Sequence, residues 1–337
     1  MVVKDGRSKV VTSDNILIAV GSLPAPGLFA ESDLVVTSDE LLQITSLPRR
    51  FAMVGAGVIG IEYASMFAAL GIDVTVVDKR SRPLEFLDEE LVDELLHQMR
   101  NMGATFRLGE AVERLEVVEN PSQRVVIFLE SGKRLVSDLT LFSAGRQGAT
   151  DRLNLPAAGL KADGRGRLTV DRAYRTNVSH IFAAGDVIGF PSLATTSAEQ
   201  GRLAACTAFD IDTDPMAPHF PIGIYAIPEM SAVGEPEHVL TARKVPYESG
   251  VTRYREIARG HIMGDDSGFL KMLFHRENHR LLGVHAVGTG ATELIHIGQA
   301  VLGLGGGLEY FLSTAFNYPT LAECYKVAAL DAFNKLA

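Results

Sequence analysis

The sequence predicts an α/β protein, and three observations lead to this prediction. Between residues 51 and 77 a strand, a glycine-rich turn, a helix and a second strand follow one another, in the order of a βαβ unit. A second helix, with apolar residues at helical spacing, ends at Gly103 and is followed by a further strand. After about residue 220, strands are followed by two helices, which is an α+β pattern. We therefore expect a parallel-sheet domain followed by an α+β domain.

The remaining elements follow from alternation, periodicity and turn residues. Two alternating strands open the chain and end at a turn around Gly21. Residues 111–138 alternate between apolar and polar and contain two turns, so we expect an antiparallel meander there. Asp and Pro residues over 210–221 mark a domain boundary. The expected strands are Ser8–Thr12, Asn15–Val20, Phe51–Val54, Asp73–Val77, Thr105–Leu108, Leu139–Ser143, Ile222–Ala226, Gly268–His275 and Leu281–Val287, and the expected helices end near Leu70 or span Asp88–Met102, Ser192–Phe209, Ala291–Leu302 and Thr320–Leu336.

Composition and charge limit the class of protein. The length of 337 residues corresponds to two or three domains, and 47% hydrophobic with 22% charged residues is ordinary for a globular protein. The formal net charge is 32 − 41 = −9, which argues against nucleic acid or a membrane surface as a partner. Two cysteines provide neither a disulfide framework nor a metal site, and the charged N-terminal residues do not resemble a secretory signal. We expect a cytoplasmic protein without a bound metal.

The glycine-rich turn carries the first chemistry. Gly55, Gly57 and Gly60 have the Gly-x-Gly-x-x-Gly spacing of a dinucleotide-binding turn. We expect Gly55 to make the tight turn, Gly57 to let a pyrophosphate approach the helix N-terminus, and Gly60 to let helix and strand pack closely. The alternative is a glycine turn without a ligand. The strand before the turn, the helix after it and acidic Asp78 at the end of the next strand favour the dinucleotide site.

The residues after that second strand bear on which nucleotide binds. A carboxylate such as Asp78 can accept a hydrogen bond from a ribose 2′-hydroxyl, whereas arginines pair with a 2′-phosphate. Lys79, Arg80 and Arg82 follow directly. NAD and NADP could therefore both be accommodated, with Asp78 and Arg80 as the discriminating residues. For any one of the three cations, a solvated position at the strand end is an equally good explanation.

Longer motifs resemble those of a known family. The glycine-rich turn continues into Glu62, and two short motifs, Ala19–Ser22 and Ser143–Arg146, frame it. The segment Thr176–Asp186 is similar to a second FAD signature. Together these residues resemble the two-dinucleotide flavoproteins related to glutathione reductase and dihydrolipoamide dehydrogenase.

The resemblance implies cofactors and roles for individual residues. It implies FAD together with NAD or NADP, and it implies that Asp186 hydrogen-bonds the ribityl chain of the flavin. A helix that opens at Ser192-Leu193-Ala194 would point its N–H groups at the flavin ring. Glu62 would lie near the flavin, where the family pairs it with a lysine. The cofactor-binding residues implied in this way are Gly21, Gly145, Gly185, Asp186, Leu193 and Ala194.

The segment Phe316–Glu323 is similar to a branch of the family whose members transfer hydride between NADPH and NAD. Tyr318 stands where the disulfide reductases have a histidine that Glu323 would orient. A phenol with a pKa near 10 is a poor base at neutral pH. We therefore expect NADPH and then NAD to use one site in turn, with Glu62, Tyr318 and Glu323 as the catalytic group and with Tyr318 and Glu323 facing the partner's flavin in a homodimer.

The resemblance also refines the expected fold. It implies a Rossmann-like NAD(P)-binding domain over 47–145, inserted in a partial FAD domain over 1–46 and 146–213, and an α+β dimerisation domain over 214–337. No segment before Asn15 resembles the first FAD motif, so we expect the C-terminal two-thirds or more of a longer protein that binds pyridine nucleotide better than FAD. Two alternatives remain: a dihydrolipoamide dehydrogenase-like disulfide reductase, and a flavin-free nucleotide-binding dimer without turnover.

Overall fold

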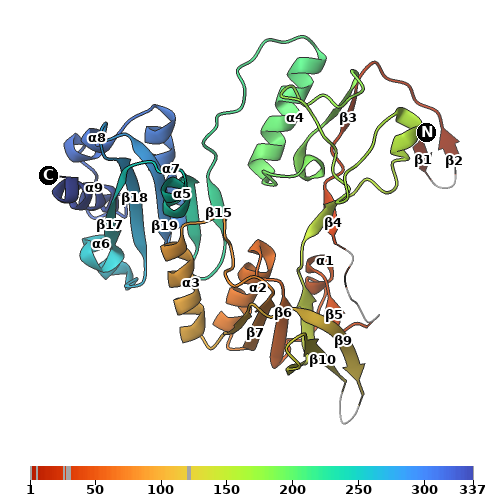
Figure 1. Cartoon of the computed structure of the whole chain (residues 1–337), viewed down its shortest axis with the longest axis horizontal. Coiled ribbons are helices and arrows are strands. Elements are labelled where there is room, and N and C mark those ends of the chain that lie inside the picture. The colour runs from red at the N-terminus through yellow and green to blue at the C-terminus, as the bar shows by residue number, and fades with distance from the viewer. Residues whose placement is uncertain (1, 5–6, 26, 28–31, 120–122, 337) are drawn as a thin grey trace. The chain divides into compact units, whose positions relative to one another are not determined.

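The computed structural model describes residues 2–4, 7–25, 27, 32–119 and 123–336. The chain divides into two compact units, which Figure 1 traces. The smaller unit comprises Met1–Ala25 and Arg146–Ala217, and the larger unit comprises Pro26–Gly145 and Pro218–Ala337. The sequence predicts four domain segments, and this division into two units does not test their bounds.

The larger unit contains the expected βαβαβ arrangement. Its five-stranded sheet has the order β5-β12-β6-β7-β8 with all neighbours parallel. Because the strands are parallel, the residues that follow β6, β7 and β12 meet at one edge of the sheet. The strands are β5 (Val35–Val36), β6 (Arg50–Val54), β7 (Asp73–Asp78), β8 (Thr105–Leu108) and β12 (Leu139–Phe142).

Helix α2 (Val58–Ala69) connects β6 to β7, and helix α3 (Glu89–Asn101) connects β7 to β8. The helix α3 begins where the sequence predicts, because the Asp88 carboxylate accepts a hydrogen bond from the Glu90 N–H and caps the helix. Its apolar face is buried along five positions at helical spacing. Those positions are Leu91, Val92, Leu95, Leu96 and Met99. A short helix, α1 (Ser38–Leu41), lies between β5 and β6.

The expected meander is an antiparallel sheet of three strands in the order β11-β10-β9. The central strand alternates buried and half-buried residues, as expected for a sheet with one buried face. Its buried residues Val125, Ile127 and Leu129 form a small core with Leu115. The strands are β9 (Val112–Val118), β10 (Arg124–Leu129) and β11 (Arg134–Ser137).

The C-terminal part of the larger unit is an antiparallel sheet in the order β15-β16-β19-β18-β17. Strands β16 and β17 were not among the strands expected from the sequence. Strand β17 lacks an apolar run because Gly250 lies where a Cβ atom would be 2.0 Å from the Ala328 carbonyl oxygen. The strands are β15 (Ile222–Ile224), β16 (Met230–Gly234), β17 (Tyr247–Arg253), β18 (Phe269–His275) and β19 (Leu281–Val287).

Both faces of this sheet are covered. Along β18, Leu270, Met272 and Phe274 pack with the C-terminal helices, whereas Phe269 belongs to a core that also contains Phe51 of β6. Lys271, on the same face of the strand as Phe269, therefore faces the nucleotide-binding part. The last helix begins at Glu323, three residues later than expected. The helices are α5 (Glu237–Ala242), α6 (Ala258–Met263), α7 (Ala291–Gly303), α8 (Leu308–Ser313) and α9 (Glu323–Leu336), with a 3₁₀ turn η3 at Tyr254–Glu256.

The smaller unit is built from short paired strands and one long helix. The expected strand Ser8–Thr12 is wrong in its bounds, because the strand spans Arg7–Lys9 and pairs with Val2–Lys4. Residues 10–12 extend beyond the end of that partner strand and form no strand. The elements are β1 (Val2–Lys4), β2 (Arg7–Lys9), β3 (Ile16–Ile18), β4 (Ser22–Pro24), β13 (Arg146–Gly148), β14 (Ile181–Ala183), α4 (Ala194–Ala208) and the 3₁₀ turns η1 (Leu155–Ala158) and η2 (Gly185–Ile188).

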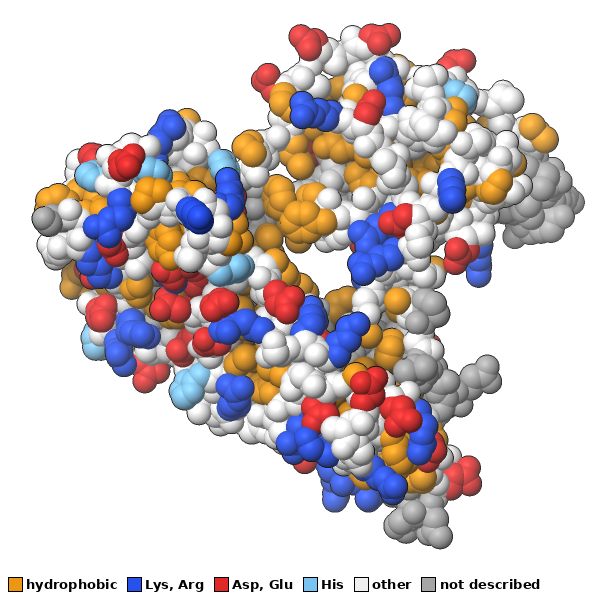
Figure 2. Space-filling view, in the orientation of Figure 1, with side chains coloured by type: hydrophobic (Ala, Val, Ile, Leu, Met, Phe, Trp, Pro, Cys, Tyr) orange, Lys and Arg blue, Asp and Glu red, His pale blue; other side chains and the backbone are white. Residues whose placement is uncertain are grey.

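The surface carries both signs of charge. On the face shown in Figure 2, Lys and Arg side chains are interspersed with Asp and Glu side chains. Among the helices that the structure describes, none is both long enough and apolar enough to cross a membrane.

Candidate functional site

The glycine-rich turn lies between β6 and α2 and has the geometry that a pyrophosphate requires. Gly55 has a φ of +111°, and a Cβ atom there would lie 2.7 Å from the Ser143 carbonyl oxygen. A Cβ atom at Gly60 would lie 1.9 Å from the Gly55 carbonyl oxygen, whereas one at Gly57 would meet no atom within 4 Å. Gly55 and Gly60 are thus required because a side chain there would clash with the backbone. Of the three glycines, only Gly57, at the start of α2, faces open space.

The segment Ser143–Arg146 contacts this turn through its first residue. The Ser143 hydroxyl donates to the carbonyl oxygens of Gly55 at 3.0 Å and Val54 at 3.2 Å. Gly145 follows with a φ of +124°, which favours glycine. The Ser143 hydroxyl therefore fixes the start of this segment to the glycine-rich turn.

Asp78, at the end of β7, accepts hydrogen bonds from its own chain that the sequence does not predict. Its side chain is buried, and one carboxylate oxygen accepts from the Ala56 N–H at 2.6 Å and from Arg80 Nη2 at 2.6 Å. The other oxygen accepts from the Arg80 N–H at 2.8 Å and from Arg80 Nε at 3.0 Å. Burial raises the pKa of Asp78, but these hydrogen bonds outweigh burial and hold the pKa below its ordinary value. Asp78 and Arg80 are thus one ion pair fixed to the glycine-rich turn.

The other two cations at this strand end differ from Arg80. Arg82 pairs with Asp93 at 2.5 Å and lies 3.8 Å from the Glu89 carboxylate, both on α3. Lys79 is exposed. Of the three cations that the sequence leaves open, two are therefore engaged by carboxylates of this chain.

Glu62, in the second turn of α2, contacts the C-terminal part of the larger unit. Its Oε1 accepts from the Tyr225 N–H at 2.8 Å, just after β15. Burial raises the pKa of Glu62 and outweighs the lowering by this hydrogen bond. One oxygen of a half-buried carboxylate is thus used to position the segment after β15.

In the smaller unit, three motifs meet around a cavity of about 200 Å³. The Ser22 hydroxyl donates to Asp186 Oδ2 at 2.8 Å and accepts from Arg146 Nε at 2.8 Å. Arg146 Nη2 also donates to the Ser22 carbonyl oxygen at 2.6 Å. The pairing of β4 with β13 brings Ser22 and Arg146 together. The sequence analysis named Asp186 as a site residue but not Ser22 or Arg146, although both end the two short motifs that it identified.

The turn before Asp186 is held by α4. Gly185 has a φ of +81°, and its N–H donates to the side chain of buried Gln200 at 2.8 Å. Leu193 and Ala194 lie at the start of α4, where no side chain caps the helix. Gly21 has a φ of +71°, and its carbonyl oxygen accepts from the Ala149 N–H. A carboxylate, a hydroxyl and a guanidinium around a cavity suit the hydroxyls and the phosphate of a dinucleotide.

Tyr318 and Glu323 lie close in sequence, but the structure does not join them. Tyr318 is 71% exposed, and no hydrogen bond links these two described side chains. Glu323, the first residue of α9, has a buried Oε2 atom without a partner among the residues described. Among the described residues, Tyr318 and Glu323 therefore do not form a hydrogen-bonded acid–base pair.

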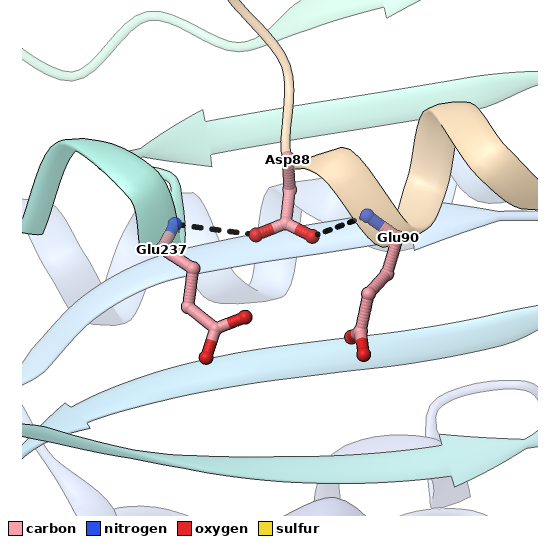
Figure 3. Close-up of side chains that lie close together, drawn as sticks. All are labelled: Asp88, Glu90 and Glu237. Carbon is pink, nitrogen blue, oxygen red and sulfur yellow. Dashed lines mark hydrogen bonds between the residues drawn. The ribbon is translucent and has the colours of Figure 1, made fainter. Parts of the chain in front are cut away.

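A second cluster, which the sequence analysis missed, lies between α3, α5 and β18. Figure 3 shows Asp88 accepting from the N–H groups of Glu90 and Glu237, at 3.1 and 3.2 Å, with the two glutamate side chains extending to the same side. Lys271 Nζ donates to Asp88 at 3.1 Å, to Glu90 at 2.8 Å and to Glu237. Although these carboxylates could ligate a metal, the buried ammonium group already provides the positive charge. An isolated lysine in a strand of apolar residues is the sequence signal for such a cluster.

Two family models match most of the chain. A family model described as pyridine nucleotide-disulphide oxidoreductase matches residues 1–201, and the model of its dimerisation domain matches residues 220–329. Fold and site together define a dinucleotide-binding oxidoreductase, and the chain belongs to the pyridine nucleotide-disulphide oxidoreductase family. The family and the fold class expected from the sequence are confirmed.

Two curated relatives of this chain carry the same name. The chain is 54% identical over 328 residues to the soluble pyridine nucleotide transhydrogenase of Mycobacterium bovis strain BCG, covering 97% of this chain and 69% of that protein. It is 46% identical to the protein of the same name from Aliivibrio fischeri, over 99% of this chain and 71% of that protein.

Among solved structures, LpdA from Mycobacterium tuberculosis is similar with a TM-score of 0.87 and 26% identity over 94% of this chain and 69% of that chain. The HOCl-induced flavoprotein disulfide reductase RclA from Escherichia coli is similar with a TM-score of 0.86 and 27% identity, over 95% of this chain and 73% of that chain.

Proposed function

We propose that the chain performs flavin-dependent hydride transfer between NADPH and NAD, with both nucleotides using the glycine-rich turn of the larger unit in succession. The proposal rests on similarity over nearly the whole chain to proteins named soluble pyridine nucleotide transhydrogenase. The observation in this chain that carries it is exposed Tyr318, which makes no hydrogen bond to Glu323. A dithiol reductase needs a base at such a position, whereas hydride transfer does not.

The residues around the glycine-rich turn fit a pyridine nucleotide. The open space at Gly57 admits a pyrophosphate at the N-terminus of α2, where the first N–H groups and the helix dipole favour a negative charge. Asp78 holds the turn through the Ala56 N–H, and Arg80 adds a cation beside it. Glu62 fixes the segment around Tyr225 against α2. These residues bind and orient a nucleotide, and none of them has to take a proton from it.

The residues around the cavity of the smaller unit fit FAD. Asp186 offers a carboxylate to ribityl hydroxyls, and Ser22 and Arg146 hold that carboxylate in place. Leu193 and Ala194 place the uncapped N-terminus of α4 where N–H groups stabilise negative charge. When bound, FAD supplies a ring that can take up a hydride and release it again. Gly21 and Gly185 give the turns of this unit a left-handed backbone, and Gly145 of the larger unit, also proposed as a cofactor-binding residue, has a positive φ as well.

The dimerisation-domain match over residues 220–329 supports a homodimer. We propose that Tyr318 and Glu323 lie at the partner's flavin in that dimer. A cytoplasmic location is also part of the proposal, supported by the word soluble in the names of the relatives and by two free cysteines.

An exchange assay on the purified flavin-containing protein tests the proposal. Hydride should pass from NADPH to thio-NAD without a disulfide substrate. Tyr318→Phe should keep this activity to within about threefold, because hydride transfer does not require a proton from the phenol. Tyr310→Phe, at another exposed tyrosine, is the matched control. Reduction of lipoamide or glutathione disulfide that is faster than exchange and that is abolished by Tyr318→Phe would instead establish the disulfide reductase.

A further inference from the structure

The hydrogen bonds of Asp78 leave no acceptor site for a ligand. Each carboxylate oxygen already accepts two hydrogen bonds, from the Ala56 N–H and Arg80 Nη2 on one side and from the Arg80 N–H and Nε on the other. A carboxylate has about four lone-pair sites in all. The side chain is also only 6% exposed. A ribose 2′-hydroxyl therefore cannot donate to Asp78 unless Arg80 first leaves it.

Arg80 is in the opposite situation. A guanidinium carries five N–H donors, and Asp78 takes the Nε donor and one Nη2 donor. The side chain is 38% exposed. The remaining donors can serve a hydroxyl oxygen or a phosphate oxygen without breaking the ion pair. Its partner Asp78 neutralises most of its charge, which weakens the preference for a phosphate over a hydroxyl.

We propose that Asp78 is a positioning residue that holds the glycine-rich turn and the Arg80 guanidinium for both nucleotides, and that Arg80 is the group that meets the 2′ position of NAD and of NADP. This inference rests on the proposed use of both nucleotides at one site. In this assignment the ion pair as a whole discriminates weakly between NAD and NADP. The alternative is that Asp78 serves one nucleotide and Arg80 the other.

Equilibrium binding of NAD and NADP to the full chain and its variants tests the assignment. Asp78→Ala should weaken both nucleotides by a similar factor, about tenfold or more, because the turn and Arg80 lose their common anchor. Asp78→Asn keeps an oxygen for the Ala56 N–H but releases Arg80. It should leave NAD affinity within about threefold and raise the NADP-to-NAD affinity ratio, because an uncompensated guanidinium prefers a phosphate.

Hydrogen exchange at the Ala56 amide provides a readout that does not depend on nucleotide. Exchange should become faster in Asp78→Ala and stay slow in Asp78→Asn. Arg80→Ala should weaken NADP more than NAD, whereas Lys79→Ala should change neither by more than about twofold. The matched control is Asp93→Asn, which removes one of the two carboxylates beside Arg82 at the same strand end and should leave the affinity ratio unchanged.

Two results overturn the assignment. One is a loss of NAD affinity alone in Asp78→Ala, which identifies Asp78 as a direct ligand of the 2′-hydroxyl. The other is a loss of NADP affinity in Lys79→Ala but not in Arg80→Ala. A wild-type chain that binds only one of the two nucleotides contradicts the proposed function instead, so the two failures are distinguishable.

Discussion

At Gly57 a Cβ atom would meet nothing within 4 Å, whereas at Gly60 it would lie 1.9 Å from the backbone oxygen of Gly55. Both glycines belong to the same short motif, and both have backbone angles that other residues tolerate, since neither is among the positive-φ positions. The difference lies in what surrounds them. Gly60 is required by helix packing, and Gly57 has space that only a ligand would use.

Two alanine substitutions separate these roles. Gly57→Ala should leave the midpoint of thermal unfolding unchanged but weaken nucleotide binding by about tenfold or more, because the new methyl group occupies the approach of the pyrophosphate. Gly60→Ala should lower the free energy of unfolding by about 1–3 kcal/mol, because α2 must shift away from β6. Thermal denaturation and nucleotide titration of both variants check this. An equal loss of stability in the two variants would refute the distinction.

At the same scale, the sequence predicted candidate nucleotide-binding residues, which stay a prediction, but not how these residues bind one another. Asp78 and Arg80 were identified as alternatives for two nucleotides, yet they form one ion pair. Arg80 lies two residues after the end of β7, where its side chain and its own N–H reach Asp78, and strand alternation does not extend to it. Ser22 could not be found in this way, because its partner Asp186 is 164 residues away.

Among the elements, the pairing of β4 with β13 determines the flavin half of the proposed site. Ser22 lies opposite Gly148, and Arg146 opposite Pro24, so two segments more than 120 residues apart in sequence share one hydroxyl. That hydroxyl links the guanidinium of Arg146 to the carboxylate of Asp186. The orientation of Asp186 therefore depends on a strand pair rather than on its own turn alone.

Ser22→Ala tests this dependence. It removes a hydrogen bond to a carboxylate, and FAD affinity should fall by about ten- to hundredfold, with a changed flavin absorption spectrum in the fraction that still binds. Ser192→Ala is the control, because Ser192 lines the same cavity but bonds to Gly189. Equal retention of FAD in both variants would show that Asp186 needs no support from Ser22.

Most elements with strong periodicity were predicted from the sequence, and those held by tertiary contacts were not. The helix α3 has both a cap and a clear apolar stripe, and its bounds were predicted to within one residue. Strand β17 was missed because its central Gly250 packs against the backbone of α9, so the usual apolar signal is absent. The strands β4 and β13 have three residues each, too few for alternation to be detected.

For the molecule as a whole, buried ionisable groups predict how stability depends on pH. His285 lies fully buried on β19 beside the cluster of Asp88 and Lys271, with Nε2 3.2 Å from the Glu235 carbonyl oxygen. Burial lowers the pKa of His285 to about 4, and outweighs the raising effect of Asp88. As the pH falls below about 6.5, the unfolded chain takes up a proton that the folded chain refuses until about pH 4.

The free energy of unfolding should therefore decrease as the pH falls from about 6.5 to 4, by up to about 3 kcal/mol from this one group. Burial raises the pKa of Asp88, but the positive charges of His285 and Lys271 and the hydrogen bonds to Asp88 outweigh burial and hold the pKa below its ordinary value of 3.8, so Asp88 adds a further loss only below this pH range. Urea denaturation across this pH range measures the slope. His285→Gln should flatten it, and His97→Gln, at an exposed histidine, should not. An unchanged slope in His285→Gln would contradict this assignment.

The core that joins β6 to the C-terminal sheet bears on how such a protein can be altered by recombination. Phe51 and Met53 of the nucleotide-binding sheet share one apolar cluster with Phe269 and Val287. A chimera that exchanges residues 50–142 for those of a relative would cut through this cluster and join two surfaces shaped for other partners. We therefore expect a graft of the nucleotide-binding strands to fold well only when it carries the facing strands of the C-terminal sheet with it.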